Sequence, residues 1–580
     1  MSIHARPRLA RGSARIFRLS ACALAAAATL SACGSSDDTA STETAQVVYK
    51  NGDILTVDKN DSVAQAVGVR DGKVIVVGTE EEVNAYVGSS TEVIDLAGKT
   101  MVPGFYDAHS HFTMAGNNAK FEVNLNSPPI STVESIADIV ELLKKKKSEV
   151  GETAWITGFG YDDTLLPEHR HPTRQELDEV STTQPILISH VSGHMAVANS
   201  FALNMAGITA STPNPDGGEI GHGPDGEPNG FLTETAVSLI KGKPALSAEQ
   251  IQAGIKAASE MYASQGVTTA NDGGSGAPGI TALETAANSG DLGIRVVAWP
   301  FGQFSKEAAD KLELTSGKVK VGGIKQIYDG SIQGYTGYLS EPYYTPYHGD
   351  ASYRGFSRIS KESLDASVME AHKAGYQLFI HANGDAAIDD VLDAYSKAQA
   401  ASPRSDTRHV LIHAQMARED QLDEMKRLNA IPSFFQLHTY YWGDRHRDIF
   451  IGPDRASRIS PAQSAQSRGL TYTLHADTPI VPMEPILMLW SAVNRISTSG
   501  AVIGFDQTIS VKDALRAITY SAAYQNFEEA ERGSIEIGKY ADFAILSANP
   551  LDVAPENIRT IQVMETIVEG ETVFKKPSGS

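Results

Sequence analysis

Cysteine is nearly absent from this sequence. The 580 residues include two cysteines, Cys22 and Cys33, and both lie in the first 33 residues. The rest of the chain therefore cannot form a disulfide, use a thiol nucleophile or bind a metal through sulfur. We expect it to be held together by its apolar core, for which 41% hydrophobic residues supply enough material.

Positive charge is also scarce. Lys and Arg number 49 against 70 Asp and Glu, which gives a formal net charge of −21 at pH 7. An acidic surface repels the phosphates of nucleic acids, so we predict no nucleic-acid partner. The charge favours solubility and carries little information about the fold.

The apolar run near the N-terminus is too short to span a bilayer comfortably. Residues 19–30 are alanine-rich and follow several arginines, which is typical of a signal peptide. The motif LSACG at residues 30–34 resembles the lipobox of bacterial lipoproteins, in which the cysteine is lipidated and becomes the mature N-terminus. We therefore predict a lipoprotein signal peptide over residues 1–33, lipidation of Cys33 and a flexible tether over residues 34–46.

The same region predicts where the protein is found. Gly34, rather than an aspartate, follows the cysteine, which favours an exported bacterial lipoprotein anchored at the periplasmic face of the outer membrane. The membrane would then be a partner through the lipid on Cys33. The alternative is an ordinary signal peptide that contains a cysteine by chance.

Short β patterns mark both ends of the remaining chain. Residues 47–100 contain apolar runs broken by turn signals such as Asp71-Gly72, and residues 533–576 contain a similar pattern. We predict that these two segments pair into one small β-sandwich.

The middle of the chain, residues 101–532, alternates apolar strands with helical stretches, as a (β/α)8 TIM barrel requires. The excursion over residues 112–265 is too long for a plain loop, so we predict an inserted α/β subdomain or lid after the first barrel strand. The predicted fold class is therefore α/β: a TIM barrel with a β-sandwich from both chain ends and an inserted subdomain. The eight candidate barrel strands are residues 101–107, 267–271, 295–299, 322–328, 377–381, 409–413, 430–434 and 470–475.

Metal-binding side chains stand at the ends of these strands. Asp107, His109 and His111 point the same way, because residues alternate across a strand. TIM-barrel active sites lie at the C-terminal ends of the strands, so we expect the polar side chains there to converge. Imidazole and carboxylate groups suit zinc and similar divalent ions, and a bound ion lowers the pKa of water from about 15.7 to about 7. The six candidate ligands are His109, His111, Lys325, His381, His413 and Asp477.

This set of residues, in this order, resembles the amidohydrolase superfamily. Within it the chain is similar to amidohydrolase family 3, the group that includes N-substituted formamide deformylase. The resemblance covers roughly residues 47–574. The motifs that carry it are VPGFYDAHSH at residues 102–111, SGHMAVANS at 192–200, IKQIYDGS at 324–331, HANGD at 381–385 and GKYADF at 538–543.

The resemblance implies a divalent metal cofactor, zinc in the first place, as one or two ions. His109 and His111 would bind the more buried ion, and His381 and His413 the second. Lys325, carboxylated by carbon dioxide, would bridge the two.

The count of ions depends on that lysine. A salt bridge from Lys325 to Asp329 or Asp385 is the alternative, and it would leave a single ion. Asp477 is implied both as a ligand and as the general base that moves the proton of the attacking water.

Three residues of the excursion are predicted to contact the substrate. His194 follows an apolar run, with a purely structural hydrogen bond as the alternative, and Tyr161 and Asp162 follow a glycine-containing stretch. His169 and His171 also have the spacing of a ligand pair. They follow no apolar strand, so we expect a loop near the cleft or plain surface.

The predicted function is hydrolysis of an amide-type C–N bond, other than a peptide bond, in a small-molecule substrate. Members of the superfamily use the same ligands as esterases, lactonases or deaminases, so these remain alternatives. A non-catalytic binding lipoprotein is a third alternative, which predicts lost ligands. The sequence leaves open whether the protein forms a homo-oligomer.

Overall fold

The computed structural model describes residues 44–577, and these form a mixed α/β fold. Residues 1–43 and 578–580 lie outside the described residues, and with them the predicted signal peptide, the lipidation site Cys33 and most of the predicted tether. Within residues 44–577, no helix combines the length and the apolar character needed to cross a bilayer.

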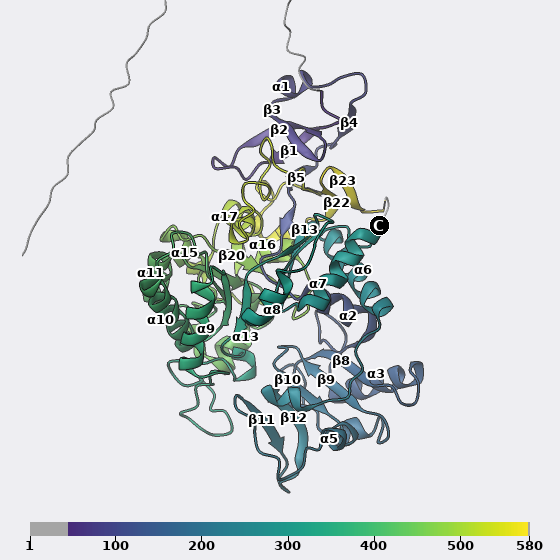
Figure 1. Ribbon diagram of the computed structural model, residues 1–580, viewed down its shortest axis with the longest axis vertical. Helices are drawn as coiled ribbons and strands as arrows, with labels where there is room; N and C mark the ends of the chain where they lie inside the picture. The colour runs from purple at the N-terminus through teal and green to yellow at the C-terminus, as the bar shows by residue number, and fades with distance from the viewer. Residues whose placement is uncertain (1–43, 578–580) are drawn as a thin grey trace, which may run out of the picture. The chain divides into compact units, whose positions relative to one another are not determined.

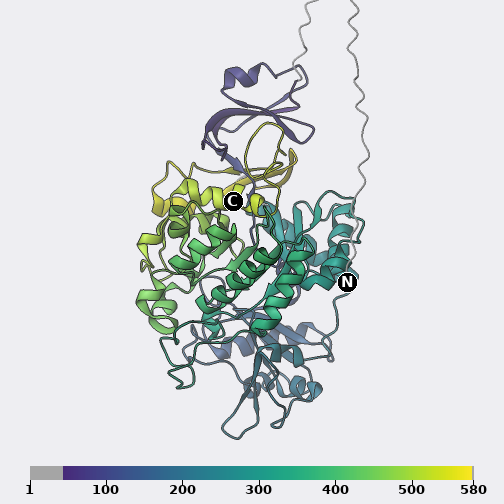
Figure 2. The ribbon, with the colours of Figure 1, turned by 60° about the vertical axis from the view of Figure 1, so that its left-hand side comes forward.

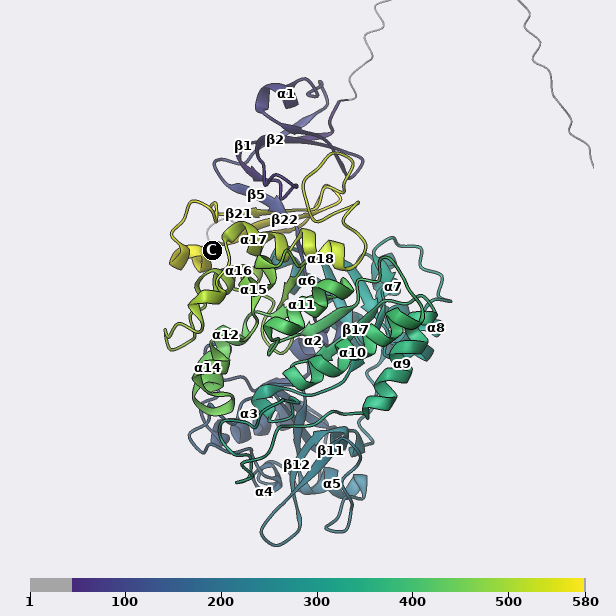
Figure 3. The ribbon, with the colours of Figure 1, turned by 90° about the vertical axis from the view of Figure 1, so that its left-hand side faces the viewer.

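Strands from both ends of the chain form one eight-stranded sheet (Figure 1). Its order is β23-β22-β21-β5-β1-β2-β3, with β4 paired to β1. The two ends join where β5 pairs antiparallel with β21, with Pro103 opposite Phe543 (Figure 3). The structure therefore has a single continuous sheet where the sequence predicted a sandwich. The strands are β1 (Val47–Leu55), β2 (Val63–Arg70), β3 (Lys73–Gly78), β4 (Glu92–Asp95), β5 (Thr100–Pro103), β21 (Phe543–Leu546), β22 (Val563–Val568) and β23 (Glu571–Lys575).

Parallel strands make up the middle of the chain, in two sheets. One has the order β15-β14-β13-β6 and the other β16-β17-β18-β19-β20. The strands are β6 (Phe105–Tyr106), β13 (Val267–Gly273), β14 (Arg295–Trp299), β15 (Val319–Val321), β16 (Ile324–Ile327), β17 (Leu378–Ala382), β18 (Val410–His413), β19 (Ile431–Phe435) and β20 (Thr473–His475).

Glycines set the limits of two of the predicted barrel strands. The first divides at Gly104 into β5, which joins the chain-end sheet, and β6, which pairs with β13. A Cβ atom on Gly104 would collide with Thr268 of β13, so only glycine allows this close approach. The fourth, predicted over residues 322–328, begins at Ile324, because Gly322 and Gly323 separate β16 from β15 and fit tightly against neighbouring strands.

The two parallel sheets do not form a closed ladder within residues 44–577. Backbone hydrogen bonds nevertheless link the segments that follow the first and the last strand. The N–H of Asp477 donates to the carbonyl of His109 at 3.2 Å, and the N–H of His111 donates to the carbonyl of Thr478 at 2.8 Å. These bonds hold the C-terminal ends of β6 and β20 next to each other.

Helices between the parallel strands cover their outer faces. α10 buries Ile388, Val391 and Leu392 in the main core and packs beside α9 and α11 (Figures 1 and 3). The helices that follow β13 are α7 (Ala277–Ser289), α8 (Gly302–Ala309), α9 (Lys361–Lys373), α10 (Asp385–Ala401), α11 (Glu419–Leu428), α12 (His438–Tyr441), α13 (Gly443–Arg445), α14 (Gly452–Ala456), α15 (Ala462–Ser467), α16 (Pro485–Asn494), α17 (Val511–Ala517) and α18 (Tyr520–Gln525).

The excursion between β6 and β13 contains a six-stranded sheet of its own, with the order β11-β12-β10-β9-β8-β7 (Figure 2). We call residues 123–246 the insertion. Its apolar side chains, such as Ile156, Ile186 and Val197, form a core separate from the main one. The elements are β7 (Val123–Asn124), β8 (Ile156–Tyr161), β9 (Ile186–His190), β10 (Met195–Ala198), β11 (Gly218–His222), β12 (Pro228–Glu234), α3 (Ile136–Glu149), α4 (Arg174–Asp178) and α5 (Ser200–Ala206), and α2 (Phe112–Phe121) and α6 (Ala248–Ser264) flank them.

Candidate metal centre

The segment after β6 brings two histidines to one carboxylate. His109 Nε2 lies 3.2 Å and His111 Nε2 lies 3.5 Å from Oδ1 of Asp477, which follows β20. Trp299 of β14 stacks on the His109 ring with the centroids 5.4 Å apart. Gly273 of β13 leaves room for that ring, since a Cβ atom there would press against it. These side chains therefore form a group whose ligand atoms are close enough to share one ion.

The other predicted ligands surround the same carboxylate. Nζ of Lys325, on β16, is 3.0 Å from His109 Nε2. The His413 ring, at the end of β18, lies 5.7 Å from the His109 ring and 4.5 Å from the His381 ring. His413 Nε2 is 3.9 Å from Oδ2 of Asp477. The structure thus brings together all six residues that the sequence nominated.

Neighbouring polar groups fix the orientation of two of these rings. Nδ1 of His381 is 3.0 Å from Oδ1 of Asp329, and Nδ1 of His413 is 3.0 Å from Nε2 of His475. His475 in turn contacts the Ser433 hydroxyl at 2.9 Å. Because Nδ1 is engaged in both cases, Nε2 is the nitrogen that can bind a metal, as is usual for metal-binding histidines. In His381 that nitrogen lies 3.4 Å from the side-chain amide nitrogen of Asn383.

The alternative salt bridges of Lys325 are not formed. Asp329 accepts hydrogen bonds from His381 and from backbone N–H groups, and Asp385 pairs with Arg418 at 3.2 Å. The neighbours of Lys325 are instead His109 and Asp477. The lysine therefore belongs to the cluster rather than to a structural ion pair.

Burial sets the protonation of the cluster. It raises the pKa of Asp477 to about 7, against the opposing charge of Lys325, and lowers the pKa of Lys325 to about 7. It also lowers the pKa of His111 to about 3 and holds the pKa values of His109 and His413 well below the usual range. The imidazoles are therefore neutral at neutral pH, which is the form that binds metals.

The donor set fits a divalent cation. Oδ1 of Asp477 and Nδ1 of His109 are buried, and neither has a hydrogen-bond partner within residues 44–577. An unpaired carboxylate oxygen is costly to bury. A cation between Asp477 Oδ1 and the two imidazole nitrogens near it would remove that cost.

The backbone is strained at two of the predicted ligands. His413 has a φ of +71° and Asp477 a φ of +56°. Residues other than glycine seldom adopt positive φ, and such strain gathers at functional sites. Its presence at two residues that face each other supports a functional assignment for the cluster.

A groove of about 640 Å³ opens beside His111. The His111 side chain is 24% exposed, whereas that of His109 is 1% exposed, so a molecule in the groove meets His111 first. Its lining is mixed: apolar side chains such as Phe159 and Phe301 alternate with polar and charged ones, among them the carboxylate of Asp272 at the end of β13. The lining includes Met114, Phe159, Gly193, Leu246, Asp272 and Phe301.

His194, predicted to contact the substrate, reaches the cluster from the insertion. Its ring lies 5.2 Å from the ring of His381. Its Nδ1 is 3.0 Å from Oε2 of Glu234, which also contacts Arg358 at 3.2 Å. The residue therefore faces the centre and makes a structural hydrogen bond as well.

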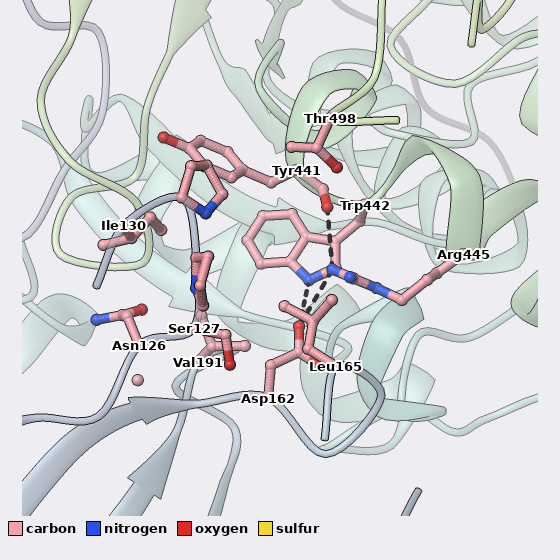
Figure 4. Close-up of a pocket in the computed structure, with 13 residues that line it drawn as sticks. Asn126, Ser127, Ile130, Asp162, Leu165, Val191, Tyr441, Trp442, Arg445 and Thr498 are labelled. Atoms are coloured by element: carbon pink, nitrogen blue, oxygen red, sulfur yellow. Dashed lines mark hydrogen bonds and ion pairs between the residues drawn. The ribbon is translucent and has the colours of Figure 1, made fainter. Parts of the chain in front are cut away.

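The other two predicted substrate contacts have different partners. Tyr161 is buried, with its hydroxyl 3.2 Å from Nδ1 of His171. Asp162 accepts hydrogen bonds from Trp442 Nε1 at 3.0 Å and from Arg445 at 3.2 Å, beside a separate cavity of about 30 Å³ (Figure 4). Within residues 44–577 neither makes a hydrogen bond or ion pair with the six predicted ligands, because Tyr161 is engaged within the insertion and Asp162 with the segment after β19.

The insertion holds a second group with ligand-like spacing: Asp162, Asp163 and His190. Here the hydrogen bonds are complete. Nδ1 of His190 accepts the N–H of Ser192 at 3.1 Å, so the ring proton sits on Nε2, which donates to Asp163 at 3.1 Å. Thr164 donates to Asp162 Oδ1 through both its N–H and its hydroxyl. A metal would have to break these bonds.

Comparison with known proteins decides the family. The profile described as "Amidohydrolase family" matches residues 92–574. This chain belongs to the amidohydrolase family. The prediction from the motifs is confirmed, and together with the cluster it makes the protein a metal-dependent hydrolase.

This amidohydrolase has relatives of several kinds. It is 30% identical to N-substituted formamide deformylase of Arthrobacter pascens, over 92% of this chain and 99% of the relative. It is also 30% identical to protein LONG AFTER FAR-RED 3 of Arabidopsis thaliana, over 91% and 92%. Among solved structures, an uncharacterized metal-dependent hydrolase from Pyrococcus horikoshii OT3 matches with a TM-score of 0.69 and 27% identity, over 88% of this chain and 99% of that one.

Sequence reasoning missed the residues that support the ligands of this amidohydrolase. Asp329 and His475 orient ligand rings, and Trp299 packs on one. Asp329 lies four residues after Lys325 in the same motif, which is the one signal that pointed to it. Glu234 has no motif around it and is identified only by its contact with His194.

Proposed function

We propose that this amidohydrolase cleaves an amide-type C–N bond, other than a peptide bond, in a small-molecule substrate. The observation that carries the proposal is the buried, unpaired Oδ1 of Asp477 beside His109 and His111. The likeness to a formamide deformylase supports the amide class. Zinc is the proposed metal, bound by His109, His111, Lys325, His381, His413 and Asp477.

The residues of the cluster divide the chemistry between them. A bound divalent ion would activate water and polarise the carbonyl of the substrate. Asp477, with a pKa raised to about 7 mainly by burial, is suited to accept the proton of the attacking water and to pass it to the leaving nitrogen. The neutral histidines keep their nitrogen lone pairs for the metal, and the groove beside His111 admits the substrate.

Lys325 decides whether one or two ions bind. Burial lowers the pKa of Lys325 from its usual value, which favours the unprotonated amine. That form reacts with carbon dioxide to give an anionic carbamate, which would bridge two ions. An ammonium group 3.0 Å from His109 Nε2 would instead repel a cation there.

We further propose that the two parallel sheets are arcs of one (β/α)8 barrel over residues 101–532. The strand order and the bonds between the ends of β6 and β20 support this. The chain-end domain would comprise residues 47–100 and 533–576, and the inserted subdomain residues 112–265. Export as a lipoprotein through Cys33, to the periplasmic face of the outer membrane, is proposed from the sequence motif.

Hydrolysis by the purified protein tests the function. A panel of N-formyl amines, N-acyl amines and matched esters is assayed with added zinc, and bound metal is measured by elemental analysis. We expect one or two ions per chain, amide turnover by the wild type, and a loss of at least about a hundredfold in kcat/KM for Asp477→Asn. A metal-free active protein, or an Asp477→Asn variant with unchanged turnover, would refute the proposal.

A further inference from the structure

Asp272, at the end of β13, lies next to the predicted ligand His111 but does not belong to the predicted ligand set. It is buried and lines the groove beside His111. Within residues 44–577, the side chains that lie close enough to share one ion with Asp477 do not include it. What Asp272 does therefore follows from the groups that its carboxylate holds.

The Asp272 carboxylate accepts three hydrogen bonds from two segments. Thr113, in the first turn of α2, donates to Oδ1 through its N–H at 3.1 Å and to Oδ2 through its hydroxyl at 2.7 Å. Ser275, in the loop after β13, donates to Oδ2 through its hydroxyl. The N-cap residue of α2 is His111, whose side chain makes no capping hydrogen bond. Asp272 therefore caps the helix from a neighbouring strand and ties its start to the end of β13.

The backbone beside Asp272 is tied to His111 as well. His111 and Asp272 form an isolated antiparallel β-bridge, and the N–H of Gly273 donates to the carbonyl of Ser110 at 2.8 Å. The backbone of Gly273 also hydrogen-bonds to the His111 side chain. The residue that follows Asp272 therefore helps to orient the His111 ring.

His111 is supported differently from the other predicted ligands. Nδ1 of His381, for example, is held by the side chain of Asp329 at 3.0 Å. Within residues 44–577 the His111 side chain makes no hydrogen bond to a side chain that could hold it in this way, and its carboxylate contact is to the predicted ligand Asp477. Its orientation therefore depends on the backbone next to Asp272.

We propose that Asp272 is a positioning residue of the metal centre, which holds His111 in the orientation that binds the ion. Its carboxylate clamps the end of β13 against the start of α2, so the ring of His111 and the backbone that orients it keep one relative position. The inference rests on the proposed function, because it requires a metal at His111. Loss of a group that orients a metal ligand typically lowers metal affinity by about 10- to 100-fold.

The zinc affinity of the purified protein, measured by competition with a chromophoric chelator, tests this. Asp272→Ala should weaken zinc binding by about tenfold or more, because His111 can then turn away from the ion. The matched control is Asp178→Ala in the insertion. Asp178 accepts the N–H of Ser200 at 3.0 Å and its hydroxyl at 2.6 Å at the start of α5, the same pair of bonds that Thr113 makes to Asp272. The control should lose stability in urea unfolding and keep the zinc affinity of the wild type.

A second set of variants asks whether Asp272 acts through His111. In a His111→Ala background, Asp272→Ala should leave the zinc affinity unchanged, because the ring that it positions is gone. Asp272→Asn keeps one acceptor oxygen and should cause a smaller loss than Asp272→Ala, which again disappears without His111. The asparagine variant decides the matter if the alanine variant does not fold.

Three results would overturn the assignment. They are an unchanged zinc affinity in Asp272→Ala, an equal loss with and without His111, and an equal loss in the control Asp178→Ala, which would show an effect of stability alone. A wild-type protein that binds no zinc or other divalent ion would instead refute the proposed function.

Discussion

Two clusters of histidine and aspartate in this chain differ in one respect that separates a metal centre from a structural network. The cluster of His109, His111 and Asp477 and that of Asp162, Asp163 and His190 both have ligand atoms at metal-binding spacing. In the second, protein donors already satisfy the side chains. In the first, a carboxylate oxygen is buried without a partner. Spacing and residue type alone therefore do not identify a metal site.

The pKa values of the aspartates also differ between the two clusters. Burial raises the pKa of Asp477 to about 7, where a carboxylate can exchange protons at neutral pH. Burial acts on Asp163 too, but the charges and hydrogen bonds of His171 and His190 outweigh it and lower its pKa to about 2. In the first cluster Asp477 has a positive φ, whereas none of the three residues of the second cluster does. The first cluster therefore has a carboxylate suited to proton transfer, whereas in the second cluster Asp163 stays ionised and hydrogen-bonded.

Removal of one histidine from each cluster should show the largest difference between them, which is in the amount of bound metal. We expect His109→Ala to weaken zinc binding by at least about a hundredfold, because it removes a ligand rather than a supporting group. His190→Ala should keep its metal and lose stability instead. Elemental analysis after dialysis against a weak chelator measures both. If His190→Ala lost its metal and His109→Ala retained it, the second cluster and not the first would be the metal centre.

Replacement of Lys325 should have a smaller effect, which is on catalytic activity. If Lys325 carries the proposed carbamate, Lys325→Ala should lower kcat/KM on the order of a hundredfold, because an anionic group of the proposed metal centre is lost. A short carboxylic acid added to the assay should restore part of the activity, since its two oxygens can occupy the place of the carbamate. Absence of rescue, together with unchanged metal content, would indicate a single ion and an unmodified lysine.

The smallest predicted effect is on stability, in the second cluster. Asp163 has a folded pKa of about 2, below its unfolded value of 3.8, so it stabilises the fold above pH 3.8 and loses this effect as the pH falls toward 2. Asp163→Asn should therefore lower the free energy of unfolding by about 2 kcal/mol at pH 7. Urea unfolding at pH 7 and near pH 2 measures it. A difference from wild type that persists near pH 2 would contradict the ionic explanation.

Strand ends were the most informative part of the sequence for this fold. The alternation of residues placed His109 and His111 on one side of a chain segment, and apolar runs located the strands that carry Lys325, His381 and His413. The division of the first strand at Gly104 was not predicted, because it depends on how closely neighbouring strands approach. The partners of Asp162 were missed for the same reason: Trp442 and Arg445 are remote in sequence.

The sequence by itself determined the family, and it nominated the candidate ligands in their order along the parallel strands, because these depend on local patterns and on motifs. Only the tertiary structure decided which cluster is left unsatisfied. The donors to Asp162 and His190 and the carboxylate that orients His194 come from segments brought together by folding. Whether a buried oxygen keeps a free lone pair for a metal depends on every group packed against it, and spacing along the chain does not contain that information.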